Sequence, residues 1–411
     1  MKRCADVVII GGGIIGCTAA YSLSKYTRDV VLLERKGIAS EASGANYGMV
    51  WEQTRQPGYD LTMARRSLEL YPTLINEVFD TDIEYEKKGG MTVFFTELER
   101  KAAEIVTRSK QSQGIPLQLL GAPEVRELEP ALSEEIMGAV YCHEDAQLNP
   151  MLTTIAFARA ARKGGVAIYT DTEVLSIKTH NQSVQSVITN RGEIKTSIVL
   201  NAAGSWASQI GNMVGLKIPV YPHKLQSFVT EQIPHVLNRV IQGTQIHRDS
   251  SLEEAVQGFS YTRNVSAERP RIGQQPFHQG ALADNTMLYI KPTVSDNIVC
   301  GTTFEFVGHD KNTSYESLTL IAANAKKTLP QLKDAHIIRS WANFDPWTVD
   351  GIPIVGETKI GGFIMAAGHG TAMSHGPATA EALAELIVHG KPIPFGEQAS
   401  ITRFTDQEGS L

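Results

Sequence analysis

The chain has 411 residues, of which 42% are hydrophobic and 20% charged, so it can bury a large core and is not a disordered or low-complexity protein. Its 38 Lys and Arg against 44 Asp and Glu give a net charge of -6, which argues against nucleic acid or an anionic membrane surface as the main partner. No apolar run reaches the ~20 residues that span a bilayer. The 4 cysteines form no CxxC pair, so we expect no local zinc or iron–sulfur site.

The first apolar run is short and ends in glycines. Val7–Ile10 is β-branched and fully apolar, which is typical of a buried parallel strand. Although the run resembles a secretory leader, Asp6 and the three glycines interrupt it, and the scarce cysteines fit a reducing compartment. We therefore expect a cytoplasmic protein.

A G-x-G-x-x-G sequence, Gly11–Gly16, follows this strand and precedes a predicted helix that continues through residues 18–23. Val30–Leu33 is a second predicted strand, and Glu34 stands at its end. Strand, glycines, helix, strand and acid in this order are typical of a dinucleotide-binding unit. The alternative is a glycine-rich turn with a surface glutamate.

Each residue type in this unit has a chemical reason. Gly11 permits the tight turn, Gly13 lets the backbone approach a pyrophosphate, and Gly16 lets the helix pack on the strand. The helix amino terminus then offers N–H groups and a positive dipole to phosphates. Glu34 would accept hydrogen bonds from a ribose diol and repel a 2′-phosphate, which disfavours NADP. The unit alone leaves FAD and NAD open.

The middle of the chain divides into helical and strand-like parts. Residues 37–48 form a small polar loop that could lie against a ligand or be an ordinary surface loop. The periodicity predicts helices over residues 66–79, 97–113, 123–128, 150–163 and 317–328. Strands are predicted at residues 167–169, 174–179, 184–189, 197–200, 226–230, 287–290 and 298–300. The polar stretch 244–285 is either an ordinary loop or a lid or partner-binding excursion.

A second glycine turn lies near the carboxyl end. Phe363–Ala367 is predicted as a buried strand, Gly368–Gly370 ends it, and a helix follows over about residues 373–389. The positive end of this helix could stabilise an anionic group at the turn. In the alternative interpretation, His369 is only a structural turn residue.

Five segments resemble the D-amino-acid-oxidase-like flavoprotein family, which includes glycine oxidase, sarcosine oxidase and the catalytic subunits of heteromeric proline, opine and amine dehydrogenases. Their order and spacing carry the resemblance, which covers nearly the whole chain. The segments are Ser40–Gly48, Thr172–Val174, Ile198–Trp206, Asp350–Gly356 and Ala366–Thr371.

The resemblance implies an α/β fold. It has a Rossmann-like FAD-binding domain of the GR2 type and an inserted α+β substrate domain on a large, mostly antiparallel sheet. The FAD-binding domain would comprise residues 1–50, 146–215 and 346–411, and the substrate domain residues 51–145 and 216–345.

The resemblance also implies a set of FAD-binding residues. Family members that attach the flavin covalently use a cysteine near residues 341–349, and none stands there, so non-covalent FAD is expected. The implied contacts are Gly11, Gly13, Ile14, Ile15, Gly16, Glu34, Arg35, Ser40, Ala42, Ser43, Asn46, Gly48, Val174, Ala203, Gly204, Trp206, Gly368, His369, Gly370, Thr371, Ala372 and Met373.

The implied reaction oxidises the C–N bond of an amino or imino acid by hydride transfer from Cα to flavin N5, giving an imine that water hydrolyses. Glycine-oxidase-like members bind the substrate carboxylate with arginines at two positions, which here hold Lys291 and Asp345. Lysine can pair a carboxylate as a point charge, whereas aspartate would bind a cationic group, such as the guanidinium of an arginine-derived opine. In the alternative, Lys291 and Asp345 form a surface pair or bond to backbone, and for Asp345 this alternative is preferred. Arg55 is a second candidate anchor, and His369 is the remaining candidate catalytic residue.

The electron acceptor depends on a comparison of relatives. Residues 306–310 resemble the heteromeric dehydrogenase subunits, so the expected partner is a second subunit with another flavin or electron-transfer centre. The alternatives are a stand-alone oxidase that uses O2, an NAD-dependent dehydrogenase, and a non-catalytic flavoprotein subunit.

Overall fold

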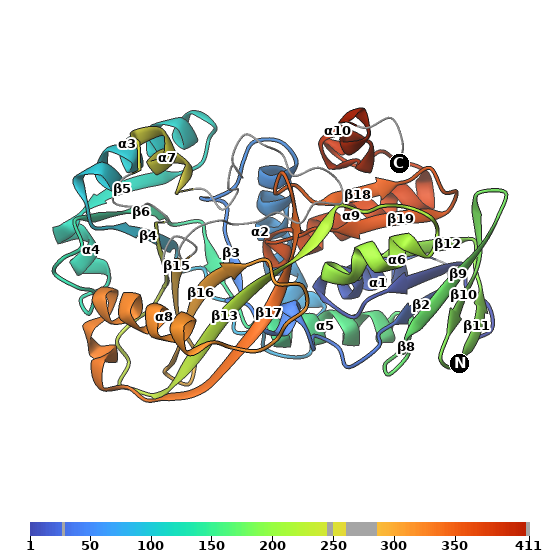
Figure 1. The fold of residues 1–411 in the computed structure, drawn as a ribbon, viewed down its shortest axis with the longest axis horizontal. Coiled ribbons are helices and arrows are strands. Elements are labelled where there is room, and N and C mark those ends of the chain that lie inside the picture. Colours follow the sequence, from blue (N-terminus) through green and yellow to red (C-terminus); the bar gives the residue numbers. More distant parts are fainter. Residues whose placement is uncertain (27–28, 245–249, 260–285, 408–411) are drawn as a thin grey trace.

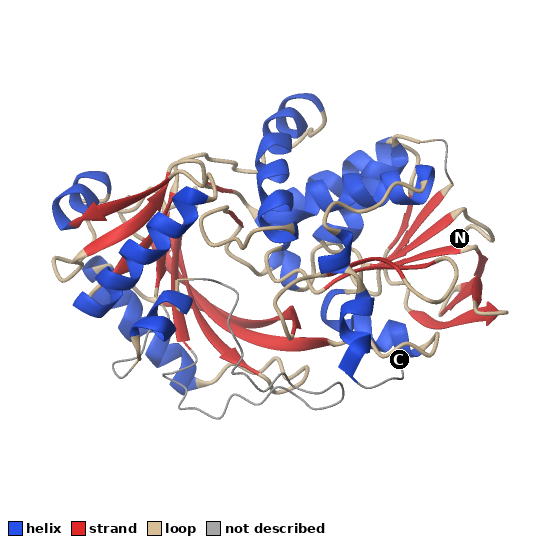
Figure 2. Ribbon diagram, turned by 90° about the horizontal axis from the view of Figure 1, so that it is seen from above, coloured by secondary structure: helices blue, strands red, loops and turns tan. Residues whose placement is uncertain are grey.

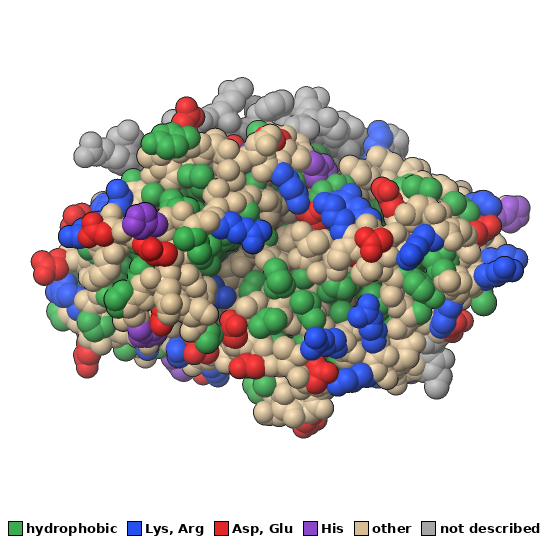
Figure 3. Space-filling view, turned by 90° about the horizontal axis from the view of Figure 1, so that it is seen from below, with side chains coloured by type: hydrophobic (Ala, Val, Ile, Leu, Met, Phe, Trp, Pro, Cys, Tyr) green, Lys and Arg blue, Asp and Glu red, His purple; other side chains and the backbone are tan. Residues whose placement is uncertain are grey.

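The computed structural model describes the whole chain except residues 27–28, 245–249, 260–285 and 408–411. Two sheets dominate the described residues and lie toward opposite ends of an elongated molecule (Figures 1 and 2). No helix in the described part of the chain is long and apolar enough to cross a membrane. On the face in Figure 3, acidic and basic side chains are interspersed, which agrees with the small net charge.

The first sheet has six strands and is parallel except for its edge strand β18. Alternate side chains of β1 enter different cores: Val7 and Ile9 pack on one face of the sheet, and Val8 and Ile10 on the other. Burial on both faces explains why its strands are continuously apolar. The order is β18 (Ile354–Glu357), β19 (Phe363–Ala367), β12 (Ile198–Asn201), β1 (Val7–Ile10), β2 (Val30–Leu33) and β8 (Ala167–Tyr169).

Helices cover one face of this sheet, and a small sheet with a short helix covers the other (Figure 1). The covering helices are α1 (Ile14–Ser24), α2 (Tyr59–Glu77), α5 (Pro150–Lys163) and α9 (Ala372–His389). The opposite face is covered by β9 (Val174–His180), β10 (Ser183–Thr189), β11 (Gly192–Lys195) and α6 (Ala207–Asn212).

The second sheet has eight strands, and only the β14–β4 pair is parallel. This confirms the large, mostly antiparallel sheet. The order is β17 (Ile337–Thr348), β13 (Val220–Gln232), β16 (Asn297–Glu305), β15 (Thr286–Pro292), β14 (Val240–Gly243), β4 (Gly90–Phe94), β6 (Gly138–Cys142) and β5 (Leu117–Gly121). The helices of this half are α3 (Glu97–Ser112), α4 (Ala122–Leu128), α7 (Leu252–Gln257) and α8 (Tyr315–Thr328).

Three short elements complete the described fold. β3 (Met49–Val50) pairs with β7 (Ala146–Gln147), and α10 (Gly396–Ala399) lies near the carboxyl end.

Most predicted elements are confirmed, and α2 shows the largest difference. The sequence predicts a helix over residues 66–79, but α2 begins at Tyr59 and ends at Glu77. Tyr59, Met63 and Tyr71 pack in the core shared with α1 and α9, so packing joins α2 to the six-stranded half, although the predicted boundary after residue 50 separates them. The stretch 244–285 contains α7, while residues 260–285 lie outside the described part, so the lid prediction remains open there.

Candidate active site

Two adjoining cavities lie where the halves meet. The strand-end cavity, about 1110 Å³, is lined by Gly11, Glu34, Val174, Gly204 and Gly368 among others. The sheet-side cavity, about 760 Å³, is lined by residues 45–49, the start of α9 and the eight-stranded sheet. Both cavities share Ala42, Ser43, Pro346, His369 and Ala372. The two glycine turns, far apart in sequence, therefore face one continuous site.

The β1–α1 turn has the geometry that its glycines predict. Gly11 has a φ of 116°, and a Cβ there would lie 2.4 Å from the Ala202 carbonyl oxygen. A Cβ on Gly16 would lie 1.9 Å from the Gly11 carbonyl oxygen, so only glycine allows α1 to pack this closely. Gly13 is the N-cap residue of α1 and offers no side-chain cap, and the Ile14 N–H donates to Ser43 Oγ over 2.9 Å. The helix amino terminus, with Ile14 and Ile15, faces the strand-end cavity and fits a diphosphate.

The acidic residue after β2 also lines the strand-end cavity. The Glu34 carboxylate accepts hydrogen bonds of 2.7 Å from the backbone N–H groups of Gly12 and Lys36, which fix its position. Beside it, the Arg35 guanidinium lies 4.0 Å from the centroid of the Trp206 ring, and that ring stacks on His309 at 4.5 Å. A fixed carboxylate next to a basic and aromatic wall suits the ribose and base of a nucleotide.

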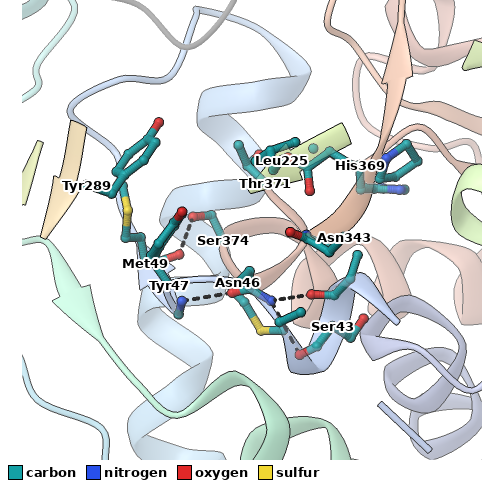
Figure 4. Close-up of a pocket in the computed structure, with 18 of the residues that line it drawn as sticks. Ser43, Asn46, Tyr47, Met49, Leu225, Tyr289, Asn343, His369, Thr371 and Ser374 are labelled. Atoms are coloured by element: carbon teal, nitrogen blue, oxygen red, sulfur yellow. Dashed lines mark hydrogen bonds between the residues drawn. The ribbon is translucent and has the colours of Figure 1, made fainter. Parts of the chain in front are cut away.

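The loop after Glu34 shapes the junction of the cavities. Asn46 Nδ2 donates to the Ala42 carbonyl over 2.9 Å, and Asn46 Oδ1 accepts from the Gly48 N–H over 2.8 Å (Figure 4). Asn46 thereby holds the backbone of residues 42–48 along the cavity wall. Of the predicted FAD contacts in this loop, Ser40 lies outside both cavities.

His369 is a buried, uncharged group at the junction. Its side chain is 3% exposed, and neither ring nitrogen has a hydrogen-bond partner among the described residues. Burial holds the pKa of His369 well below its usual range, so the imidazole is neutral. The following residues Gly370, Thr371 and Met373 line the sheet-side cavity. The interpretation of His369 as a mere turn residue does not account for a buried ring with two unpaired nitrogens in a residue that lines both cavities.

Arg55 reaches the sheet-side cavity from the loop before α2. It is 4% exposed, and its Nη1 lies 3.5 Å from Asp60 Oδ1, which also accepts a 2.8 Å hydrogen bond from His375 Nε2. Burial opposes ionisation of Asp60, but Arg55 and His375 outweigh it and lower the carboxyl pKa to about 2. This ion pair fixes the guanidinium in place.

Asp345 and Lys291 lie in different places. Asp345, on β17, is 8% exposed and lines the sheet-side cavity. Lys291 is equally buried, but its Nζ donates to the Leu148 carbonyl over 2.5 Å and it lines a separate surface pocket. The two residues are buried and do not form a surface pair, but Lys291 does bond to backbone, as the alternative interpretation also allowed. Lys291 is not among the residues that line the sheet-side cavity.

Several residues that line the sheet-side cavity were not predicted from the sequence. Tyr289 stacks on Tyr47 with ring centroids 4.8 Å apart, and Tyr47 Oη hydrogen-bonds Ser227 Oγ at 2.7 Å. Figure 4 shows Tyr289 and His369 on opposite sides of the cavity. The sequence offered one signal for Tyr289. Alternate residues of a strand share a face, and Tyr289 stands two residues before Lys291 on β15. The other missed residues include Leu225, Gln242 and Asn343, from three separate strands.

The fold and site together define a class. A dinucleotide-type turn, a fixed acid after the second strand and a second glycine turn surround one cavity that opens onto a substrate-sized cavity under a second sheet. The arrangement is that of a flavoprotein oxidoreductase. The family model described as FAD dependent oxidoreductase matches residues 6–386, and the chain belongs to this family.

Comparisons with individual proteins agree with this assignment. Hydrogen cyanide synthase subunit HcnC of Pseudomonas protegens is 27% identical over 406 residues, covering 89% of this chain and 87% of that protein. Glycine oxidase of Geobacillus kaustophilus is 28% identical over 396 residues, covering 93% and 92%. The structure of L-proline dehydrogenase from P. horikoshii superposes with a TM-score of 0.82 at 26% identity, covering 100% of each chain. FAD is the cofactor, and the residues lining the strand-end cavity fit it.

Non-covalent attachment of FAD remains a prediction. None of Cys4, Cys17, Cys142 and Cys300 lines either cavity. We expect acid precipitation to release all the yellow colour into the supernatant, and colour retained in the pellet would contradict non-covalent binding.

Proposed function

We propose that the chain oxidises the C–N bond of a small amino or imino acid, giving an imine that water hydrolyses, and that it does so as the catalytic subunit of a dehydrogenase complex. One observation carries the substrate class. Among the described residues that line the sheet-side cavity, Arg55 is the one Arg or Lys and Asp345 the one Asp or Glu. A cavity with one group of each sign complements a zwitterion.

Arg55 binds the substrate carboxylate in this proposal. A guanidinium can hold a carboxylate through two parallel hydrogen bonds, and Asp60 fixes its orientation before substrate arrives. The short bond of 2.6 Å from Arg55 Nη2 to Thr54 Oγ1 adds to this positioning.

Asp345 attracts the cationic nitrogen of the substrate, or a second cationic group such as the guanidinium of an arginine-derived opine. His369 contributes a neutral ring at the junction, which can hydrogen-bond without adding charge. Bound FAD supplies the hydride acceptor for this chemistry. The buried walls exclude water while the hydride moves.

The acceptor proposal rests on the relatives and on residues 306–310. The curated name of one relative describes a subunit of hydrogen cyanide synthase. Val307 in this segment is 46% exposed beside His309, which stacks on the cavity residue Trp206. We place the contact with a second subunit here. The second candidate is a stand-alone oxidase, which the similarity to glycine oxidase favours.

Anaerobic reduction of the bound flavin tests the function. Glycine, sarcosine, D- and L-proline, other D-amino acids and opines would be added in turn while the flavin absorbance is recorded. At least one of them is expected to bleach the flavin, and bleaching by no amino or imino acid would refute amino-acid oxidation.

The same preparation tests the acceptor. If a dehydrogenase complex is formed, a second chain co-purifies from the native source and reoxidation by O2 is slow. Rapid reoxidation by O2 without any partner would favour the oxidase.

A further inference from the structure

The sheet-side cavity contains a glutamine whose amide has no partner. Gln242 on β14 lines this cavity and is 1% exposed, and neither Nε2 nor Oε1 is hydrogen-bonded among the described residues. Buried polar groups nearly always have partners, because an unpaired amide loses its hydration without compensation. An unpaired amide on the wall of a substrate cavity is explained if a ligand completes its hydrogen bonds.

The neighbours of Gln242 in the sheet are engaged elsewhere. Thr92, opposite Gln242 in the β14–β4 pair, donates its hydroxyl to Gln53 Oε1 over 3.1 Å. Gln53 Nε2 in turn donates to the Asp145 carboxylate over 2.6 Å. Tyr289, opposite Gln242 on the other side, stacks on Tyr47. The polar groups of Thr92 and Gln53 thus bond to each other and to Asp145, and neither pairs with the Gln242 amide.

Tyr47, the tyrosine that stacks on Tyr289, is held in place by the eight-stranded sheet. Gly301 pairs with both Tyr289 and Ser227, and a Cβ on Gly301 would lie 1.7 Å from Tyr47 Oη. The missing side chain makes room for Tyr47, whose hydroxyl bonds Ser227. Because the Tyr47 hydroxyl is already paired, Gln242 is the better placed of the two to recognise a polar group of the substrate.

We propose that Gln242 determines specificity by binding a carboxamide on the substrate side chain through both of its amide atoms. Nε2 donates to the carboxamide oxygen, and Oε1 accepts from its N–H. This inference rests on the proposed function and names its substrate class: an amino or imino acid whose side chain ends in a carboxamide. An apolar side chain of the same shape leaves the buried amide unpaired and is rejected.

Binding of substrate analogues tests this without turnover. The probes are 4-carbamoylbutanoate and 5-methylhexanoate, which share a carboxylate and a similar shape but differ in the amide, and neither has an amine to oxidise. Calorimetry on the FAD-loaded protein is expected to give at least about 10-fold tighter binding of the carbamoyl compound. In Gln242→Leu this preference disappears or reverses. An equal preference in both proteins, or none in the unaltered protein, would overturn the inference.

A matched variant and a stability measurement guard against a folding artefact. Gln118→Leu changes an exposed glutamine on β5 of the same sheet and should keep the carbamoyl preference. The Tm of ligand-free Gln242→Leu should be equal to or higher than that of the unaltered protein, since an unpaired amide is removed. A lower Tm accompanied by loss of flavin would show that the amide has a structural role and would also overturn the inference.

Flavin bleaching separates this inference from the proposed function. Both enantiomers of glutamine are compared with those of 2-amino-5-methylhexanoate and alanine. If no amino or imino acid bleaches the flavin, the proposed function fails. If alanine and 2-amino-5-methylhexanoate bleach it as readily as glutamine does, only the role of Gln242 fails.

Discussion

Arg55 and Lys291 are two buried cations with opposite surroundings. Arg55 lies beside the Asp60 carboxylate and lines the sheet-side cavity. Lys291 is bound through its ammonium to the Leu148 carbonyl, and burial lowers its pKa to about 8. A carboxylate partner retains a full charge in the interior, whereas a single carbonyl does not compensate for the lost hydration. Burial of a cation therefore does not by itself identify an anion-binding residue.

Removal of the Arg55 guanidinium is expected to have the largest effect on activity. In Arg55→Gln, kcat/KM for the substrate found by flavin bleaching is expected to fall by about 10²-fold or more, because a buried charge-assisted contact is lost. Arg55→Lys should recover part of this loss. Steady-state kinetics measure both variants.

Arg66→Gln provides the control for Arg55. Arg66 makes exposed ion pairs with Glu69 on the same helix and with Glu381 on α9, and its substitution should leave the kinetics unchanged. Unchanged kcat/KM in Arg55→Gln would show that the carboxylate binds elsewhere.

Substitution of Asp60, the ion-pair partner of Arg55, should change the kinetics less than substitution of Arg55 itself. Asp60→Asn should raise KM by about 10-fold with little change in kcat, because the guanidinium remains but loses its fixed orientation. Since the pKa of Asp60 is lowered, its ionised form stabilises the fold above pH ~4, and this contribution of about 2 kcal/mol is lost as the pH falls toward 2. Unfolding of the variant should lack this part of the acid dependence. A matching acid profile in both proteins would contradict the ion pair.

Lys291→Met should have the smallest effect of these substitutions on kcat/KM and on the free energy of unfolding at neutral pH. The pKa of Lys291 is lowered in the fold, so the unfolded chain binds more protons between pH 8 and about 10.5, and stability rises across this window as pH increases. The variant should lose this rise. Its free energy of unfolding at pH 7 should be within about 1 kcal/mol of that of the unaltered protein. The substitution removes the cost of burying an ammonium group but leaves the Leu148 carbonyl without a partner, and these two effects oppose each other. Denaturant titrations at several pH values measure this.

Lys110 titrates in the same window, since burial lowers its pKa to about 8 as well. Only the difference between Lys291→Met and the unaltered protein therefore reports on Lys291. If Lys291→Met reduced kcat/KM as strongly as Arg55→Gln, Lys291 would have to be counted among the substrate-binding residues.

The cofactor half of the site was largely predictable, because short contiguous motifs encode it. Gly11, Glu34 and Gly368 stand at strand ends, and parallel strands bring their carboxyl ends to one edge of the sheet. The substrate half was not, since Gln242, Tyr289 and Asn343 come from different strands whose register the sequence does not display. The misplacement of Lys291 has the same cause: the Leu148 carbonyl that binds it is more than a hundred residues away.

The site draws on segments from Ile10 to Ser374, with its two glycine turns more than 350 residues apart in the sequence. No short contiguous fragment contains both walls of the junction at His369. During synthesis the growing chain thus has no complete receptor for its coenzyme until α9 emerges, and we expect flavin capture to be a late event in biogenesis.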